Sequence, residues 1–257
     1  MSMIKNGDFL DFNKLNQYLI QNNTEQSNKL KEIHRITGGS FLADDIIESA
    51  NVSICGIGGF PIVNSENGSL INGNVINKET LESSFYTMSG ISAFMSYLNP
   101  ANMELHDLGK KVTNDYNHLS ILHTVSVNLF ISGLSIGVEH EFSSQRDIIH
   151  LSRLTVAKTH AQNSPCLVLS DKDHFELYRK VLNYTKNEIN SAGLSKNSEV
   201  QNLLFPTAKA SAIMITGSLK NILKLIELKN AGGKEKEFVA ILEKIDEVLK
   251  KNIFHIK

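Results

Sequence analysis

Residues 118–142 read HLSILHTVSVNLFISGLSIGVEHEF, and this stretch predicts the centre of the fold. Apolar residues alternate with polar ones along it: Val125, Val127, Leu129 and Ile131 alternate with Thr124, Ser126 and Asn128. The period of two predicts a strand over 121–131 with one buried face, because successive side chains of a strand point to opposite sides. Ser132-Gly133 then breaks the pattern, and we expect a helix from about residue 134.

The next stretch, HEFSSQRDIIHLSRLTVAKTH (140–160), concentrates basic side chains. If it is helical, Arg146, His150 and Arg153 fall at i, i+4 and i+7 and share one face. Arginine offers a planar fork of donors, so this face predicts a site for phosphate or carboxylate. A solvated helix face with incidental charge fits the same spacing, and the sequence leaves both interpretations open.

The rest of the chain predicts a mixed α and β protein in which helices are the majority. Helices are expected over 1–37, 79–110, 173–192 and 234–251, and short strands at VSICGI (52–57) and FPIV (60–63). Pro206 predicts the start of another helix, which 216–218 interrupts. Ser218 then caps a further helix, and Gly232-Gly233 ends it.

Composition bounds the class of protein. The 257 residues suit one large domain or two small ones, and the net charge of -1 gives no global case for binding a nucleic acid polymer or an acidic membrane. Cys55 and Cys166 form neither a CxxC pair nor a disulfide framework. The N-terminal segment has no apolar signal region, and no apolar run reaches the length of a membrane span. We therefore expect a cytoplasmic protein without a membrane anchor.

Common catalytic and metal-binding motifs are missing. Four histidines, at 118, 123, 140 and 150, lack HExxH or HxH spacing, so no metal site is expected. The sequence also lacks a GxSxG elbow, a GxxxxGK[ST] loop and a GxGxxG loop.

Three segments resemble the flavin-dependent thymidylate synthases. Residues 118–142 are similar to the family's His-x-Ser/Thr-x-x-Glu-His segment and the Gly-(Ile/Leu)-Ser turn after it, although Leu122 stands where the family has Glu. FPTAKASAIMITGSLKNILKLIELK (205–229) resembles the family's C-terminal block, and SANVSI (49–54) its Ala-Ala-Arg-Val-Ser-Phe. The resemblance implies an α+β fold with a central antiparallel sheet and helices. It also implies a single domain over 1–257, with a divergent N-terminal helical and loop extension of about 1–110.

The residues that carry the family's chemistry are mostly replaced. The signature Arg-His-Arg falls on Ser144, Gln145 and Arg146, and the nucleotide-activating Arg falls on Lys229. The resemblance implies cofactor-binding positions at Ser120, Ser144, Gln145, Arg146, Ser218, Lys220 and Lys224. It implies substrate-binding positions at Glu141, His150, Ser152, Arg153 and Lys229, with Lys229 also the catalytic position.

For activity, the resemblance implies transfer of a one-carbon unit from methylenetetrahydrofolate to C5 of a uridine monophosphate, with FAD and NADPH. The expected nucleotide is deoxyuridine monophosphate (dUMP) or a relative, and the expected assembly is a homo-oligomer, a homotetramer in that family. Lysine keeps the charge of a replaced arginine but loses its fork. Two alternatives therefore stay open: a different flavin or nucleotide chemistry, or a non-catalytic nucleotide- or flavin-binding homo-oligomer that keeps the scaffold.

Overall fold

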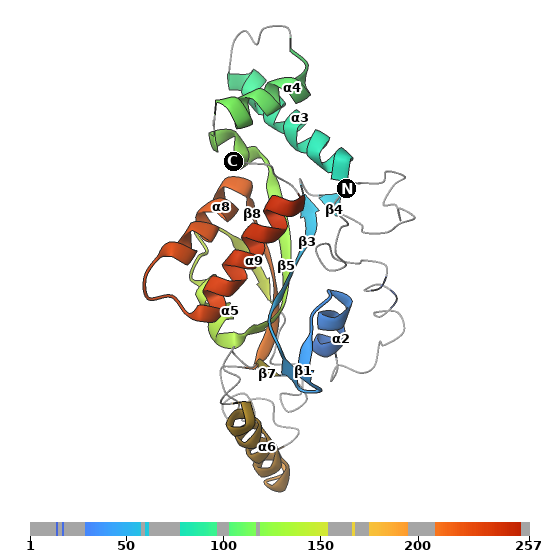
Figure 1. The fold of residues 1–257 in the computed structure, drawn as a ribbon, viewed down its shortest axis with the longest axis vertical. Helices are drawn as coiled ribbons and strands as arrows, with labels where there is room; N and C mark the ends of the chain where they lie inside the picture. Colours follow the sequence, from blue (N-terminus) through green and yellow to red (C-terminus); the bar gives the residue numbers. More distant parts are fainter. Residues whose placement is uncertain are drawn as a thin grey trace.

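The computed structural model describes residues 29–57, 60–61, 78–96, 103–116, 119–153, 166–167, 175–194 and 209–252, together with positions 14 and 17. Its centre is a five-stranded sheet in the order β4-β3-β5-β8-β6, with antiparallel neighbours throughout (Figure 1). The strands are β3 (Asn51–Ile57), β4 (Phe60–Pro61), β5 (Ser126–Ser135), β6 (His150–Arg153) and β8 (Ala210–Ser218). The α+β class with a central antiparallel sheet is therefore confirmed. β3 belongs to this sheet although it lies in the predicted N-terminal extension, and that division of the chain stays a prediction.

Three helices cover one face of the sheet: α5 (Ile136–Ser143), α8 (Leu219–Glu227) and α9 (Lys236–Asn252). The main core lies between them and the strands. Ile54, Leu129 and Ile215 from the sheet are fully buried there with Phe142 of α5 and Phe238 of α9, whose rings meet edge to face. Burying large apolar side chains at about 1.5–3 kcal/mol each is the main force that holds these layers together.

The strand predicted over 121–131 exists, but it is displaced along the chain. Residues before it form a short 3-10 helix, η3 (Leu119–Thr124), and β5 continues through Gly133 to Ser135. Gly133 has a φ of +77°, where the pairing register with β8 shifts. A Cβ at this position would collide with the ring of buried His34, so the glycine serves both the bulge and the packing. The helix expected from about 134 begins at Ile136.

The helix predicted to start at Pro206 is wrong within the described residues, because Ala210–Ser218 form strand β8. β8 pairs with β5 along the whole of its length and also with β6, and these backbone hydrogen bonds decide its conformation. Its buried residues at 211, 213 and 215 face the helix-covered side. The cap of the next helix is confirmed, since the Ser218 hydroxyl accepts from the Asn221 amide at 3.2 Å. That helix ends before Gly232-Gly233, in a 3-10 turn, η8 (Leu228–Asn230).

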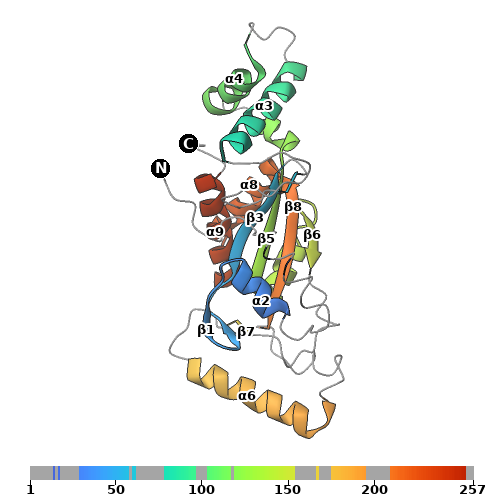
Figure 2. The same ribbon diagram turned by 90° about the vertical axis from the view of Figure 1, so that its right-hand side faces the viewer.

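The opposite face of the sheet carries α2 (Lys29–Ile36), which packs on Ala210 and Ala212 of β8. Next to it lies a small three-stranded sheet of β1 (Phe41–Ala43), β2 (Ile46–Ile47) and β7 (Cys166–Leu167). Helix α6 (Phe175–Ser191), as expected from the sequence, lies at one end of the molecule (Figure 2). Asp45 ties it there, because its carboxylate pairs with Lys186 of α6 and with Lys31 of α2. The helical region predicted over 1–37 contains α2, and its residues 1–28 lie outside the described residues apart from positions 14 and 17.

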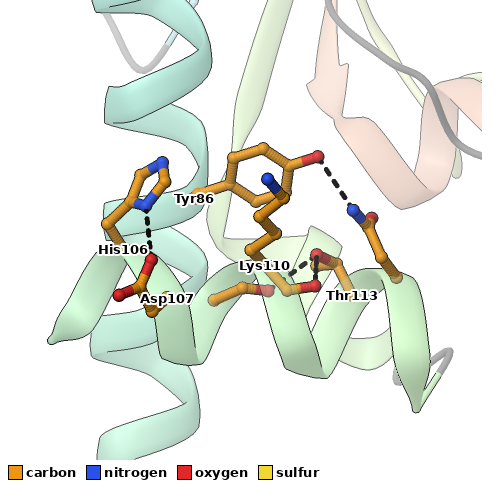
Figure 3. A network of polar contacts seen from close by, with 7 residues as sticks. Tyr86, His106, Asp107, Lys110 and Thr113 are labelled. Carbon is orange, nitrogen blue, oxygen red and sulfur yellow. Dashed lines mark hydrogen bonds and ion pairs between the residues drawn. The ribbon is translucent and has the colours of Figure 1, made fainter. Parts of the chain in front are cut away.

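A helical hairpin forms the other end: α3 (Lys78–Ser96), α4 (Leu105–Lys110) and the π-helical turn η2 (Lys111–Asp115). Gly90 and Gly109 let the two helices cross closely, because a Cβ on either would collide with backbone of the other. Figure 3 shows the polar contacts that support the crossing. The Tyr86 ring packs edge-on against His106, and its hydroxyl accepts from Asn114 at 3.1 Å. This hairpin corresponds to the helical region predicted over 79–110.

Among the described residues, no helix is long and apolar enough to cross a membrane. Cys55 and Cys166 are both buried free thiols, and burial raises the pKa of each to about 11. Both therefore remain protonated and unreactive at neutral pH.

Candidate nucleotide-binding site

A pocket of about 280 Å³ lies at the edge of the central sheet, where the chain passes from α5 to β6. One short segment lines it: Ser143, Arg146, Ile149, His150, Leu151 and Arg153. The structure therefore brings the basic residues predicted from the sequence together around one pocket. Its volume is just below the roughly 300–1,000 Å³ typical of small-molecule sites, so it is too small for a whole dinucleotide.

The three basic residues do not share a helix face, so that prediction is wrong. α5 ends at Ser143, a turn follows, and 150–153 form edge strand β6. In the pairing of β6 with β8, Arg153 lies opposite Ile213 and His150 lies opposite Thr216. Because strand side chains alternate, Arg153 is on the helix-covered face and His150 is on the other. The helical spacing is overridden by backbone hydrogen bonds to a strand that is distant in sequence.

Arg153 is anchored by an acidic residue that the sequence did not single out. Its Nη1 lies 3.4 Å from Oε1 of Glu139 on α5, and that carboxylate is almost completely buried. The other oxygen of Glu139 accepts from the hydroxyl of Ser211 on β8. No sequence signal pointed to these contacts, because Arg153 is 14 residues and Ser211 is 72 residues away from Glu139 in the chain.

On the other face, a polar row crosses three strands. His150 lies opposite Thr216, and Thr216 lies opposite Asn128 and donates to its side-chain oxygen at 2.7 Å. Two residues after Thr216, at the end of β8, the Ser218 hydroxyl lies 3.2 Å from Nδ1 of His123. The alternation in 124–131 marks Asn128 as polar, but only the strand register shows its neighbours.

The first turn of α8 lies against the pocket segment. The Asn221 side chain donates to the Ile148 carbonyl at 2.9 Å, which fixes α8 beside the turn that carries Arg146. Lys220 and Lys224 are one turn apart on this helix and share a face, the first half-buried and the second exposed. Ser218, Lys220 and Lys224 are thus grouped at the α8 end of the site.

Besides Arg153, two further predicted substrate residues are engaged in ion pairs. Nζ of Lys229 lies 2.7 Å from Oδ2 of Asp246 on α9, and Nζ of Lys250 lies 2.9 Å from the same oxygen. Burial alone would raise the pKa of Asp246, but the hydrogen bonds from these lysines lower it below its ordinary value. Glu141 pairs with Lys234 at 3.2 Å. Within the described part of the chain, neither Lys229 nor Glu141 lines the pocket. Their roles in substrate binding stay predictions.

The remaining predicted positions lie around the pocket or on the surface. Ser144 donates to the Glu141 carbonyl at 2.7 Å and accepts from Gln145 at 2.9 Å, so both side chains are held within the turn. Ser152 is exposed on β6, and Ser120 is exposed in η3. Among the residues that the structure describes, no three His, Cys, Asp or Glu side chains gather as metal ligands. His118 lies outside those residues.

No family model and no curated protein matches the sequence. Solved structures do match the fold. A flavin-dependent thymidylate synthase from Helicobacter pylori, complexed with FAD and dUMP, aligns with a TM-score of 0.54 at 15% identity, over 67% of this chain and 96% of that one. The fold is that of the flavin-dependent thymidylate synthases. A second Helicobacter pylori structure of this enzyme, with FAD and dUMP, gives a TM-score of 0.52 at 14% identity, over 63% and 88% of the two chains.

The thymidylate synthase fold is shared with a further enzyme of related chemistry. A UMP/dUMP methylase from Streptomyces cacaoi, bound with 5-Br dUMP, aligns with a TM-score of 0.53 at 11% identity, over 81% of this chain and 93% of that one. The resemblance noted in the sequence is therefore confirmed at the level of fold.

Proposed function

We propose that this protein binds a pyrimidine nucleoside monophosphate, dUMP or a relative, and acts as a flavin-dependent nucleotide methyltransferase of the thymidylate synthase kind. The observation that carries the proposal is the pocket lined by Arg146 and Arg153 at the edge of this sheet. A phosphate or a pyrimidine carbonyl suits two arginine forks, because each fork donates two parallel hydrogen bonds. Bound dUMP, or an analogue of it, in three structures of two proteins with the same fold supports the choice of ligand.

The flavin is proposed to lie beside the pocket, not within it. Arg146, Lys220 and Lys224 offer three cationic side chains, and Ser218 offers a hydroxyl, to the phosphates of FAD, because Asn221 holds α8 against the Arg146 turn. Ser120, Ser144 and Gln145 complete the proposed cofactor positions. FAD, reduced by NADPH, would supply hydride equivalents, while methylenetetrahydrofolate would supply the carbon.

The chain's own residues would bind and orient the nucleotide. Arg153, held by Glu139, presents its guanidinium to the pocket, and Arg146 approaches from the turn before β6. Orientation of this kind contributes to catalysis by fixing the reacting atoms in place. Lys229 is proposed to stabilise charge on the pyrimidine as a point charge. A homo-oligomer, a tetramer as in the family, is part of the proposal.

A second candidate function is supported by the replacement of the signature Arg-His-Arg. Only Arg146 retains an arginine there, while Ser144 and Gln145 are hydrogen-bonded to each other within the turn. Methyl transfer in this family uses several cationic side chains. Fewer would be needed by a non-catalytic nucleotide- or flavin-binding homo-oligomer, or by an enzyme with a different flavin or nucleotide chemistry.

The test separates binding from turnover. Calorimetry with dUMP, with and without FAD, measures binding, and flavin absorbance of the purified protein measures cofactor content. A second assay supplies FAD, NADPH, methylenetetrahydrofolate and dUMP, and detects thymidylate by mass. Binding with turnover supports the methyltransferase, and binding without turnover supports the second candidate. Absence of nucleotide binding and of flavin under every condition would reject both. Light scattering that finds only monomer would reject the proposed assembly.

A further inference from the structure

Glu139 is a buried acid placed directly behind a pocket arginine. The residue is 3% exposed, whereas the side chain of Arg153 is 57% exposed. One carboxylate oxygen lies 3.4 Å from Nη1 of Arg153, and the other accepts the hydroxyl hydrogen of Ser211. Ser211 is itself completely buried. The carboxylate therefore links the interior of the sheet to a side chain at the surface.

The strand register explains why these three residues meet. Arg153 on β6 lies opposite Ile213 on β8, so these two side chains point to the same face of the sheet. Ser211 is two residues before Ile213 on the same strand, so its side chain points to that face as well. α5 crosses this face and carries Glu139. β8 is an inner strand of the sheet, and Ser211 on it is paired with Leu134 of β5, so Ser211 gives the carboxylate a rigid support.

Stability alone is a poor reason for an acid at this place. Removing a carboxylate from water is costly, and well-packed apolar residues often replace a buried ion pair with no loss of stability. What Glu139 adds is a fixed direction for the arginine. A free arginine loses rotamer entropy when a ligand immobilises it, and an arginine held beforehand loses less.

We propose that Glu139 is a positioning residue, which with Ser211 holds the guanidinium of Arg153 in the orientation that binds the nucleotide. This inference rests on the proposed nucleotide-binding function of the pocket. It also predicts that the loss of positioning affects some ligands more than others. Inorganic phosphate binds through one group and can shift with a mobile Arg153. A nucleotide is also held through its base or sugar, so it needs the guanidinium in one fixed orientation.

The test asks whether Glu139→Gln weakens or strengthens the binding of dUMP and of inorganic phosphate. This change keeps the size of the side chain and removes one negative charge next to the pocket. If Glu139 acted through charge alone, its removal would strengthen the binding of dUMP and of inorganic phosphate alike. Positioning instead predicts that dUMP binding weakens about tenfold, the scale of one hydrogen bond to a charged group, while phosphate binding does not weaken.

A double-mutant cycle shows whether the effect passes through Arg153. In an Arg153→Ala background, we expect Glu139→Gln to cause no further loss of dUMP affinity. Ser211→Ala should weaken dUMP binding in the same direction, by a smaller factor. Glu237→Gln is the matched control, because Glu237 is a buried acid that binds Ser135 and does not line the pocket. It should leave dUMP affinity at the wild-type value.

The outcomes are distinguishable by calorimetry and thermal unfolding. Wild-type protein that binds no nucleotide would overturn the proposed function and this inference with it. Wild-type binding, with Glu139→Gln and Ser211→Ala equal to wild type or tighter, would overturn the positioning role alone. If Glu139→Gln does not fold, Ser211→Ala and its cycle with Arg153→Ala decide the question. An equal loss of affinity in Glu237→Gln would show a general structural effect and would also overturn the role.

Discussion

The ammonium group of Lys229 lies 2.7 Å from the carboxylate of Asp246, and this ion pair joins the end of α8 to α9. Both side chains are at least two-thirds buried, so solvent screens the pair only partly. Lys229 is also the residue that the family resemblance assigns to the pyrimidine of the nucleotide. The same side chain is therefore needed for a contact between helices and is proposed for a contact with substrate.

Substitution at this pair separates the two roles. We expect Lys229→Ala and Asp246→Asn to lower the free energy of unfolding by about 1 kcal/mol each, because either change breaks the pair. Thermal and urea unfolding measure this loss. If Lys229 also contacts the nucleotide, only Lys229→Ala weakens dUMP binding in calorimetry. Equal dUMP affinity in the two variants would remove Lys229 from the site.

Arg146 is expected to contribute directly to anion binding. Arg146→Ala should weaken dUMP binding by about 1.5–3 kcal/mol, the range for a hydrogen bond to a charged group. Arg179→Ala is a suitable control, because Arg179 is an exposed arginine on α6 that pairs with Glu176 and not with the pocket. Calorimetry that gives the same dUMP affinity for Arg146→Ala and Arg179→Ala would favour the solvated surface that the sequence left open.

Because of His34, we expect the free energy of unfolding to fall in mild acid. The side chain is fully buried, and this burial lowers its pKa from 6.5 to about 4. The unfolded chain then binds a proton below pH 6.5 that the folded protein does not bind until about pH 4. Stability is therefore fully present above pH 6.5 and falls toward pH 4, by up to about 3 kcal/mol from this group.

Urea unfolding at a series of pH values tests this contribution. In wild type the free energy of unfolding should decrease across that window, and in His34→Gln the decrease should be smaller. His140→Gln serves as the control, because His140 is exposed at the surface of α5. An unchanged pH slope in His34→Gln would show that another group causes the acid sensitivity.

Three glycines allow the packing role of Gly133 to be measured. Gly133→Ala combines an unfavourable positive φ with a collision against His34, and we expect it to cost more than 2 kcal/mol, roughly the sum of backbone strain and overpacking. Gly233 has the positive φ but open space around it, so Gly233→Ala should cost only about 1 kcal/mol. Gly232 has neither feature, and Gly232→Ala should be neutral. Thermal unfolding that ranks the three variants in another order would contradict this account.

The sequence by itself determined those parts of the protein that depend on local patterns. The alternation at 125–131 predicted β5, and the apolar spacing in 219–228 and 234–251 predicted α8 and α9 with the Ser218 cap. These features are local because helix and strand periods are set by residues close together in the chain. Motif resemblance added the class of fold, and the basic residues at 146–153 indicated where the pocket lies.

Only the tertiary structure decided how those residues are arranged. His150–Arg153 and Ala210–Ser218 became strands because they hydrogen-bond to each other and to β5, although their local spacing also fits a helix. That pairing placed His150 and Arg153 on opposite faces of the sheet. The same register brought Ser211 under Glu139, and helix packing brought Asp246 to Lys229. The physical reason is that such contacts join segments far apart in the chain, and a strand's partner is not encoded in its own period.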